Sequence, residues 1–235
     1  MTLIKLLNLT IYRLILLSLL SALSSFNTLA DNAYETFIKT PNADTAFSYI
    51  FAVAKHPRCA NCHGIVEDGI HKPTVGEYRD NHPMNITALN NLILTIKDHH
   101  FEQVPSAAMN CRSCHQDENQ KEPGMPPGAA NDKMPGFVWH MPPATMAIPH
   151  DITPMQLCEQ WLDPAKNSHL VYRGGKDDLA TFRAEFLDHH AKVDPLILWS
   201  WEPGPGREPA PGSNKDFLNA LDIWISAGAP CPTTK

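Results

Sequence analysis

The chain has 235 residues, in which 25 Asp and Glu outnumber 19 Lys and Arg and give a formal net charge of −6. This length allows one domain or two small ones. Surfaces that bind nucleic acid carry clustered Lys and Arg, and the chain has no basic stripe, so nucleic acid is excluded as an expected partner.

Residues 1–30 have the features of a secretory signal peptide. Two basic residues precede an uncharged run over residues 14–23, and Thr28-Leu29-Ala30 forms a small-x-small cleavage site. The run is shorter than the roughly 20 apolar residues that span a bilayer. We therefore expect residues 31–235 to be periplasmic, with membrane contact only if the signal segment stays uncleaved as an anchor.

The first predicted element of the mature chain is a helix over residues 44–55. Its apolar residues recur at the spacing of one helical face, and Asp44 is a candidate N-terminal cap. His56-Pro57 ends this helix and leads the chain into the first of two short motifs.

These motifs are Cys59-Ala60-Asn61-Cys62-His63 and Cys111-Arg112-Ser113-Cys114-His115, both with the pattern C-x-x-C-H. In this pattern two thiols bond to the vinyl groups of a haem, and the adjacent imidazole binds the iron. The sequence therefore predicts two covalently bound haem c groups. The predicted attachment residues are Cys59, Cys62, Cys111 and Cys114, and the predicted proximal iron ligands are His63 and His115.

Two other readings of the cysteines are a redox-active C-x-x-C pair and a four-cysteine zinc site. A thioredoxin-like pair would need a surrounding βαβ pattern, which is not seen here. Two C-x-x-C pairs can hold zinc, but neither reading explains a histidine after both motifs. The haem interpretation accounts for all six residues.

A second helix is predicted over residues 87–97, between the motifs, from an apolar stripe at helical spacing. Only 52 positions separate Cys59 from Cys111. That is too short for two complete haem domains in tandem. We therefore expect two haems close together in one shared fold.

The segment 122–154 carries eight prolines together with several large apolar residues. This density of proline excludes a long helix or a central strand. The apolar content argues against a solvated linker. We expect a loop that packs against haem.

Three helices are predicted in the last third of the chain, over residues 153–162, 176–190 and 213–228. No run alternates convincingly with period two. The predicted fold class is mainly α and cytochrome c-like, with little or no β. Short helices and long Pro/Gly-rich loops would wrap two c-type haems, with a haem-binding part over 31–150 and a helical C-terminal part over 151–235.

The sixth iron ligands are less constrained than the fifth, and they set the redox potential. His82 and Met84 follow the first motif, with His71 as a further candidate, and the proline-rich segment offers Met125, Met134, His140, Met141 and Met146. We predict His82 for one haem and Met146 or Met141 for the other. An open sixth position is the alternative and would allow ligand binding.

Cys158 and Cys231 remain after the haem cysteines are assigned, and an oxidising compartment favours a disulfide between them. Two free buried thiols are the alternative. Asp98-His99-His100 and Asp188-His189-His190 could suggest metal sites. Their places at predicted helix ends favour a charge interaction with the helix dipole instead.

With these motifs the chain resembles the di-haem c-type cytochromes. Its ending, Trp224-Ile225-Ser226-Ala227-Gly228-Ala229-Pro230, is similar to the closing helix of many cytochrome c modules. More loosely, residues 58–63, 139–143, 201–207 and 229–232 resemble exported proteins that carry the label of an isoquinoline 1-oxidoreductase subunit. No segment resembles a molybdenum-cofactor or iron–sulfur domain, so catalysis on an organic substrate would belong to another chain.

The resemblance implies a periplasmic electron carrier rather than an enzyme. Its partners would be redox proteins: a dehydrogenase or quinol-side donor, and an acceptor. The alternative is a small haem enzyme, such as a di-haem peroxidase or an oxidoreductase subunit, which would need one open or displaceable sixth ligand. Asp117, Glu118 and His140 would then be its candidate acid–base groups.

Overall fold

The structure is a computed structural model that describes residues 30–87, 93–97, 100–104, 111–129, 139–167 and 183–233. The predicted signal peptide lies outside these residues, apart from residue 30. Helices predominate, as predicted. After a helical stretch over residues 30–39, the helices are α2 (Ala43–Lys55), α3 (Pro57–His63), α4 (Pro154–Leu162), the π-helix η4 (Arg183–Ala191), α7 (Pro195–Trp199) and α8 (Asn214–Ser226). Single 3-10 turns are η1 (Pro83–Asn85), η2 (Cys111–Ser113) and η3 (Ala144–Met146).

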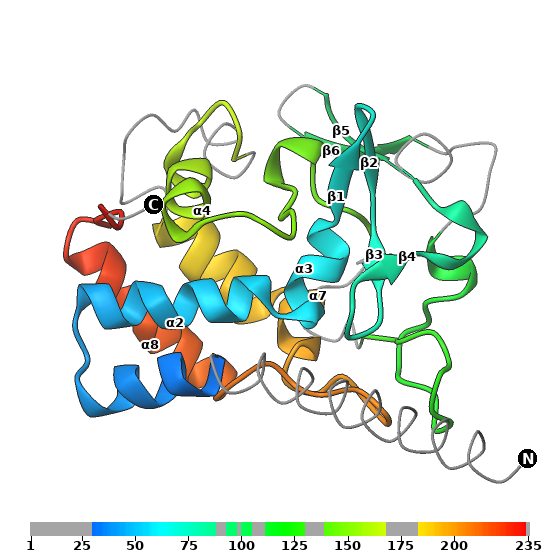
Figure 1. The fold of residues 1–235 in the computed structure, drawn as a ribbon. Coiled ribbons are helices and arrows are strands. Elements are labelled where there is room, and N and C mark those ends of the chain that lie inside the picture. Colours follow the sequence, from blue (N-terminus) through cyan, green and yellow to red (C-terminus); the bar gives the residue numbers. More distant parts are fainter. Residues whose placement is uncertain are drawn as a thin grey trace, which may run out of the picture.

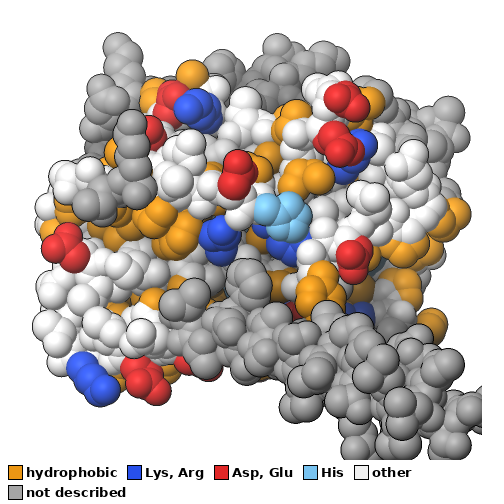
Figure 2. Space-filling view, viewed as in Figure 1, with side chains coloured by type: hydrophobic (Ala, Val, Ile, Leu, Met, Phe, Trp, Pro, Cys, Tyr) orange, Lys and Arg blue, Asp and Glu red, His pale blue; other side chains and the backbone are white. Residues whose placement is uncertain are grey.

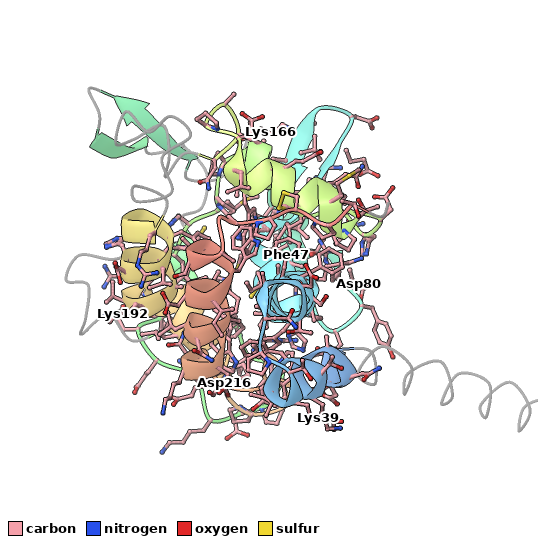
Figure 3. The ribbon with its side chains drawn as sticks, turned by 90° about the vertical axis from the view of Figure 1, so that its left-hand side faces the viewer. Lys39, Phe47, Asp80, Lys166, Lys192 and Asp216 are labelled. Atoms are coloured by element: carbon pink, nitrogen blue, oxygen red, sulfur yellow. A yellow bond between two sulfur atoms is a disulfide. The ribbon has the colours of Figure 1, made fainter. Side chains whose placement is uncertain are left out.

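The main core lies between α2 and α8, which pack side by side (Figure 1). Figure 3 places Phe47 of α2 in this interior, where its ring lies 5.0 Å from that of Trp224. Trp161 of α4 and Phe186 of η4 extend the core, with ring centroids 4.7 Å apart. These side chains are almost fully buried, and such burial is the main favourable term in folding.

The caps of the main helices are mostly those that the sequence predicts. Thr153 caps α4 in a reciprocal capping box with Gln156, and the Ser213 hydroxyl accepts from the backbone N–H of Asp216 at the start of α8. The prediction for α2 is wrong by two residues. Asn42 caps this helix, because its side chain accepts two backbone N–H groups, and Asp44 lies in the first turn.

A disulfide joins Cys158 of α4 to Cys231 near the C-terminus, as predicted, with 5.6 Å between the two Cα atoms. It appears as a yellow bond in Figure 3. The bond spans 73 positions of sequence and fixes the chain end beyond α8 against α4. The disulfide therefore closes a long loop of the chain around the core.

Three antiparallel hairpins lie beside the helical part: β1 (Ile65–Glu67) with β2 (Ile70–Lys72), β3 (Thr74–Val75) with β4 (Asp80–Asn81), and β5 (Ile93–Lys97) with β6 (His100–Val104). The prediction of a helix over 87–97 is wrong, because residues 93–97 form β5. Its Ile-Leu-Thr-Ile run is rich in β-branched residues, which favour strands, and a short apolar run does not reveal its period.

The π-helix η4 replaces the last half of the helix predicted over 176–190, whose residues 176–182 lie outside the described part. The proline-rich segment, where described, contains only the 3-10 turn η3 before α4, as its proline content predicts. Within the described ranges no helix is both long and apolar enough to cross a membrane. Acidic and basic side chains are interspersed on the face shown in Figure 2.

Candidate functional site

The first C-x-x-C-H motif forms the helix α3, which begins immediately after α2. His56 separates the two helices, and its Nδ1 accepts a hydrogen bond from the backbone N–H of Arg58 at 3.3 Å. Pro57 occupies the first helical position, where no N–H is needed. Gly64 ends the helix with a φ of +63°, and a Cβ there would lie 2.1 Å from the carbonyl oxygen of Lys72, so only glycine fits this reversal.

His63, the last residue of α3, has its Nδ1 fixed by the backbone of η3. The distance from Nδ1 to the Met146 carbonyl oxygen is 2.7 Å, and since a carbonyl can only accept, Nδ1 carries the proton. Burial lowers the pKa of His63 to about 4, so the ring is neutral at pH 7. His63 thus has the tautomer in which Nε2 is the electron-pair donor.

An apolar pocket surrounds this imidazole. Its wall is built from α2, α4, η4, α7, α8 and the proline-rich segment, and includes Val53, Ile148, Trp161, Phe186 and Phe217. Cys59, Met146 and His190 also line it. The first motif therefore faces the largest hydrophobic core of the protein.

A buried guanidinium holds the end of α3 against η3. Arg79 donates to the carbonyl oxygens of Ala60 at 3.1 Å and Gly64 at 3.4 Å, and also to that of Ile148. His71, a candidate ligand from the sequence, instead hydrogen-bonds through Nε2 to the carbonyl oxygen of His63 at 2.8 Å. Both residues position the motif.

The thiols of the first motif are in their neutral form. Burial raises the pKa of Cys59 to about 11 and that of Cys62 to about 12, and the two sulfurs are not joined in a disulfide. A redox-active C-x-x-C pair depends on a thiol with a lowered pKa, so this reading is disfavoured. Among the described residues, which include all four motif cysteines, no three His, Cys, Asp or Glu side chains are grouped to hold a bare metal ion.

The second motif begins in the 3-10 turn η2 and lies nearer the surface, with Cys114 exposed. His115 repeats the arrangement of His63: its Nδ1 lies 2.9 Å from the carbonyl oxygen of Pro127. Its ring stacks on Trp139 with centroids 4.3 Å apart. Burial lowers the pKa of His115 to about 4 as well.

Asn119 fixes the segment that supplies the Pro127 carbonyl. Its Oδ1 accepts from the backbone N–H of Gly128 at 3.2 Å and from Nε1 of Trp199 at 3.0 Å, and its Nδ2 donates to the carbonyl oxygen of Glu202. A Cβ on Gly128 would lie 1.9 Å from the carbonyl oxygen of Glu118, so the backbones approach too closely for any other residue.

The two motifs meet at a small aromatic cluster. Cys62 of the first and Cys111 of the second both pack against the cluster of Ala129, Trp139 and Trp199. The two indole rings lie 5.9 Å apart, edge to face. Arg58, which pairs with Glu77, lies over the Trp199 ring, with its guanidinium carbon 5.8 Å from the ring centroid.

The candidate sixth ligands are divided between the two motifs. The His82 ring lies 6.2 Å from that of His115, so His82 belongs with the second motif although it follows the first in sequence. Met146 is buried beside His63, Met141 is half-buried just before the pocket residue Pro142, and Met84 is 67% exposed. Met125 is largely exposed, and Met134 lies outside the described residues.

His190 is the pocket residue whose place the sequence did not predict. It lies in the last turn of η4, but its Nδ1 pairs with Oδ2 of Asp194 at 3.0 Å. Burial alone would raise the pKa of Asp194, but hydrogen bonds from His190 and from the N–H of Leu196 outweigh it and lower the pKa. The His-x-x-x-Asp spacing before Pro195 was the available signal.

Comparisons with known proteins add no family to this geometry. No protein-family model, curated protein or solved structure matches the chain. The functional assignment therefore depends on the two motifs and the residues around them.

Proposed function

We propose that the exported chain is a di-haem c-type cytochrome that passes single electrons from a dehydrogenase or quinol-side donor to an acceptor protein. The observation that carries this proposal is the repeated imidazole arrangement. In both C-x-x-C-H motifs, the histidine Nδ1 donates to a backbone carbonyl, from His63 to Met146 and from His115 to Pro127. Metal-binding histidines are oriented in this way, with the other nitrogen left as the ligand.

The residues around the first motif fit a haem. The pocket wall is mostly apolar, as the face of a macrocycle requires, and Cys59 and His63 both line it. Trp161, also in the wall, has a buried Nε1 with no hydrogen-bond partner among the described residues, which a propionate oxygen would satisfy. Thioether formation adds each thiol S–H across one vinyl double bond, so it needs no oxidant.

At the second motif, His82 is the sixth ligand that the geometry supports. Metal–imidazole bonds are about 2 Å long, and the ring adds about 1 Å, so two imidazoles on opposite sides of one iron have centroids about 6 Å apart. The His82 and His115 centroids are 6.2 Å apart. This distance supports His82, which the sequence offered for one haem, as the residue that would hold the second haem together with His115.

Haem iron would supply the one-electron chemistry, by cycling between its ferric and ferrous states. The protein would hold both groups through neutral imidazoles and exclude water from the first site with its apolar wall. Attachment at Cys62 and Cys111, which share the Trp139–Trp199 cluster, would bring the edges of the two groups close together. Electrons would then need only a short path between the two sites.

The first test is the intact mass of the secreted protein, produced with the machinery that attaches haem c. The wild type should carry the mass of two haems. Replacing Cys59 and Cys62 with Ala should remove one, as should replacing Cys111 and Cys114. The matched control, in which Cys158 and Cys231 are replaced by Ala, should keep both. A wild-type product that is bare polypeptide would overturn the proposal.

The second test separates the electron carrier from the haem enzyme. Two six-coordinate irons should leave the reduced protein unresponsive to carbon monoxide, and the protein should exchange electrons with a redox partner without consuming peroxide. Binding of carbon monoxide at one iron of the wild type, together with peroxide turnover, would contradict electron transfer as the sole function.

A further inference from the structure

We infer that His190, held in place by Asp194, is the sixth iron ligand of the haem attached through Cys59 and Cys62. This inference rests on the proposed function and deepens it, because it assigns the remaining ligand of the first site. The sequence did not offer either residue as a haem ligand, and it set aside Asp188-His189-His190 as a possible metal site.

The composition of the pocket limits the candidates. His63 and His190 are the imidazoles that line it, and nearly all the remaining wall is aliphatic, aromatic or proline. Besides His63, and Cys59, which would be taken up by attachment, the lining offers two side chains that could bind a haem iron, His190 and Met146. The choice of ligand is therefore between two named residues.

Met146 is the poorer candidate because of its backbone. Its carbonyl oxygen accepts the hydrogen bond from His63 Nδ1, so the Met146 backbone lies on the Nδ1 side of the ring. Nε2, on the other side of the ring, is the nitrogen left to hold a haem. Met146 is thus already used through its backbone to orient His63, which leaves His190 as the second residue that would hold the group.

The pairing of His190 with Asp194 orients the His190 ring. The Nδ1 to Oδ2 distance is 3.0 Å, which favours the tautomer that carries the proton on Nδ1 and donates it to the carboxylate. Oδ1 of Asp194 also accepts the N–H of Leu196 at 2.9 Å and so caps α7. Metal-binding histidines commonly donate their second nitrogen to such a fixed carboxylate, which makes the ligand more basic.

The backbone around His190 has an unusual helical geometry. His190 lies in a nine-residue π-helix, a rare geometry that is frequent at functional sites. Phe186 from the same π-helix also lines the pocket, where it packs on Trp161. The π-helix thus brings two of its residues to the pocket wall.

The experiment is electron paramagnetic resonance of the two-haem protein, purified as wild type, His190→Ala and His189→Ala. The wild type should contain two low-spin ferric irons. His190→Ala should lose half of the low-spin intensity, gain a high-spin signal and bind carbon monoxide at one iron when reduced, and added imidazole should restore the low-spin signal. His189→Ala, an exposed neighbour on the same helix, should match the wild type.

Two further variants keep the test decisive if His190→Ala does not accumulate. Met146→Leu should keep both low-spin signals. Asp194→Asn should raise the midpoint potential of one haem and leave the other unchanged. Unaltered spectra in His190→Ala, unaltered potentials in Asp194→Asn, or loss of a low-spin signal in Met146→Leu would each overturn the assignment. Intact mass distinguishes this failure from failure of the proposed function, because two attached haems would still be present.

Discussion

The two C-x-x-C-H motifs share one pattern but have differently built surroundings. The first forms a capped α-helix whose end is held by buried Arg79 and which faces the main core. The second forms a 3-10 turn near the surface, where Asn119 and a stacked Trp139 hold its neighbours. The pentapeptide thus fixes the spacing of its thiols and imidazole, whereas distant residues determine how deeply they are buried.

The surroundings nevertheless place both histidines in the same chemical state. Each Nδ1 is tied to a carbonyl oxygen of the segment between the second motif and α4, and burial lowers both pKa values to about 4. The same histidine tautomer, with the proton on Nδ1, is therefore selected at two sites that are packed differently. The difference between the sites should appear in stability rather than in the protonation state of the histidine.

The largest stability effect should come from removing the Cys158–Cys231 disulfide, which closes the core beside the first site. For a loop of this length the chain-entropy model gives about 4 kcal/mol. Replacement of both cysteines by Ala should lower the free energy of unfolding by that amount in denaturant titrations. The absorption bands of the haem that we propose at the second site should keep their positions in the native variant. A loss below about 1 kcal/mol would mean that the core does not depend on this closure.

A smaller and more direct comparison uses one anchor from each site. Arg79→Met leaves two carbonyl oxygens at the end of α3 and one at Ile148 without this donor, which should cost about 2–4 kcal/mol, since hydrogen bonds to charged groups are the strong ones. Asn119→Ala removes neutral hydrogen bonds and should cost about 1–2 kcal/mol. Denaturant unfolding of both variants measures the two losses. Equal losses would contradict the view that the first site is the more firmly anchored.

The smallest expected effect is a pH dependence that belongs to the first site. Burial lowers the pKa of His56 from 6.5 to about 4, so between these values the unfolded chain binds the proton more readily than the native one. His56 therefore contributes stability above pH 6.5 that is lost as the pH falls toward 4. His56→Asn, which keeps a capping side chain without this titration, should lose about 1–2 kcal/mol less than the wild type between pH 7 and pH 5. Parallel stability curves for the two proteins would refute this role.

The elements that the sequence predicted well are those with both a periodic face and a local cap. α4 and α8 begin at the predicted caps Thr153 and Ser213, and α2 follows its apolar stripe although Asn42 rather than Asp44 caps it. The helix predicted over 87–97 is wrong over residues 93–97, where β-branched residues form β5, because an apolar stripe of this length fits a helix and a short strand alike. The short helices α3 and α7 have a proline and a capping side chain but no stripe, so periodicity did not reveal them.

The residues of the candidate site can also be separated into those that the sequence could predict and those that it could not. Cysteine and histidine spacing predicts the attachment residues, which stay a prediction, because that chemistry is local in sequence. Contacts between distant residues were not readable: His82 beside His115, Cys62 near Cys111, and His190 beside the first pocket. These contacts depend on which distant segments of the chain pack together, and the hydrophobic pattern does not specify that.

Cys59 and Cys62 are closely packed in the folded protein. Both thiols stay protonated there, with pKa values of about 11 and 12. In the unfolded chain the same thiols would have ordinary acidity and open access. If haem is attached as we propose, its attachment would therefore come before folding, and the bond between Cys158 and Cys231 would close a protein that already carries it.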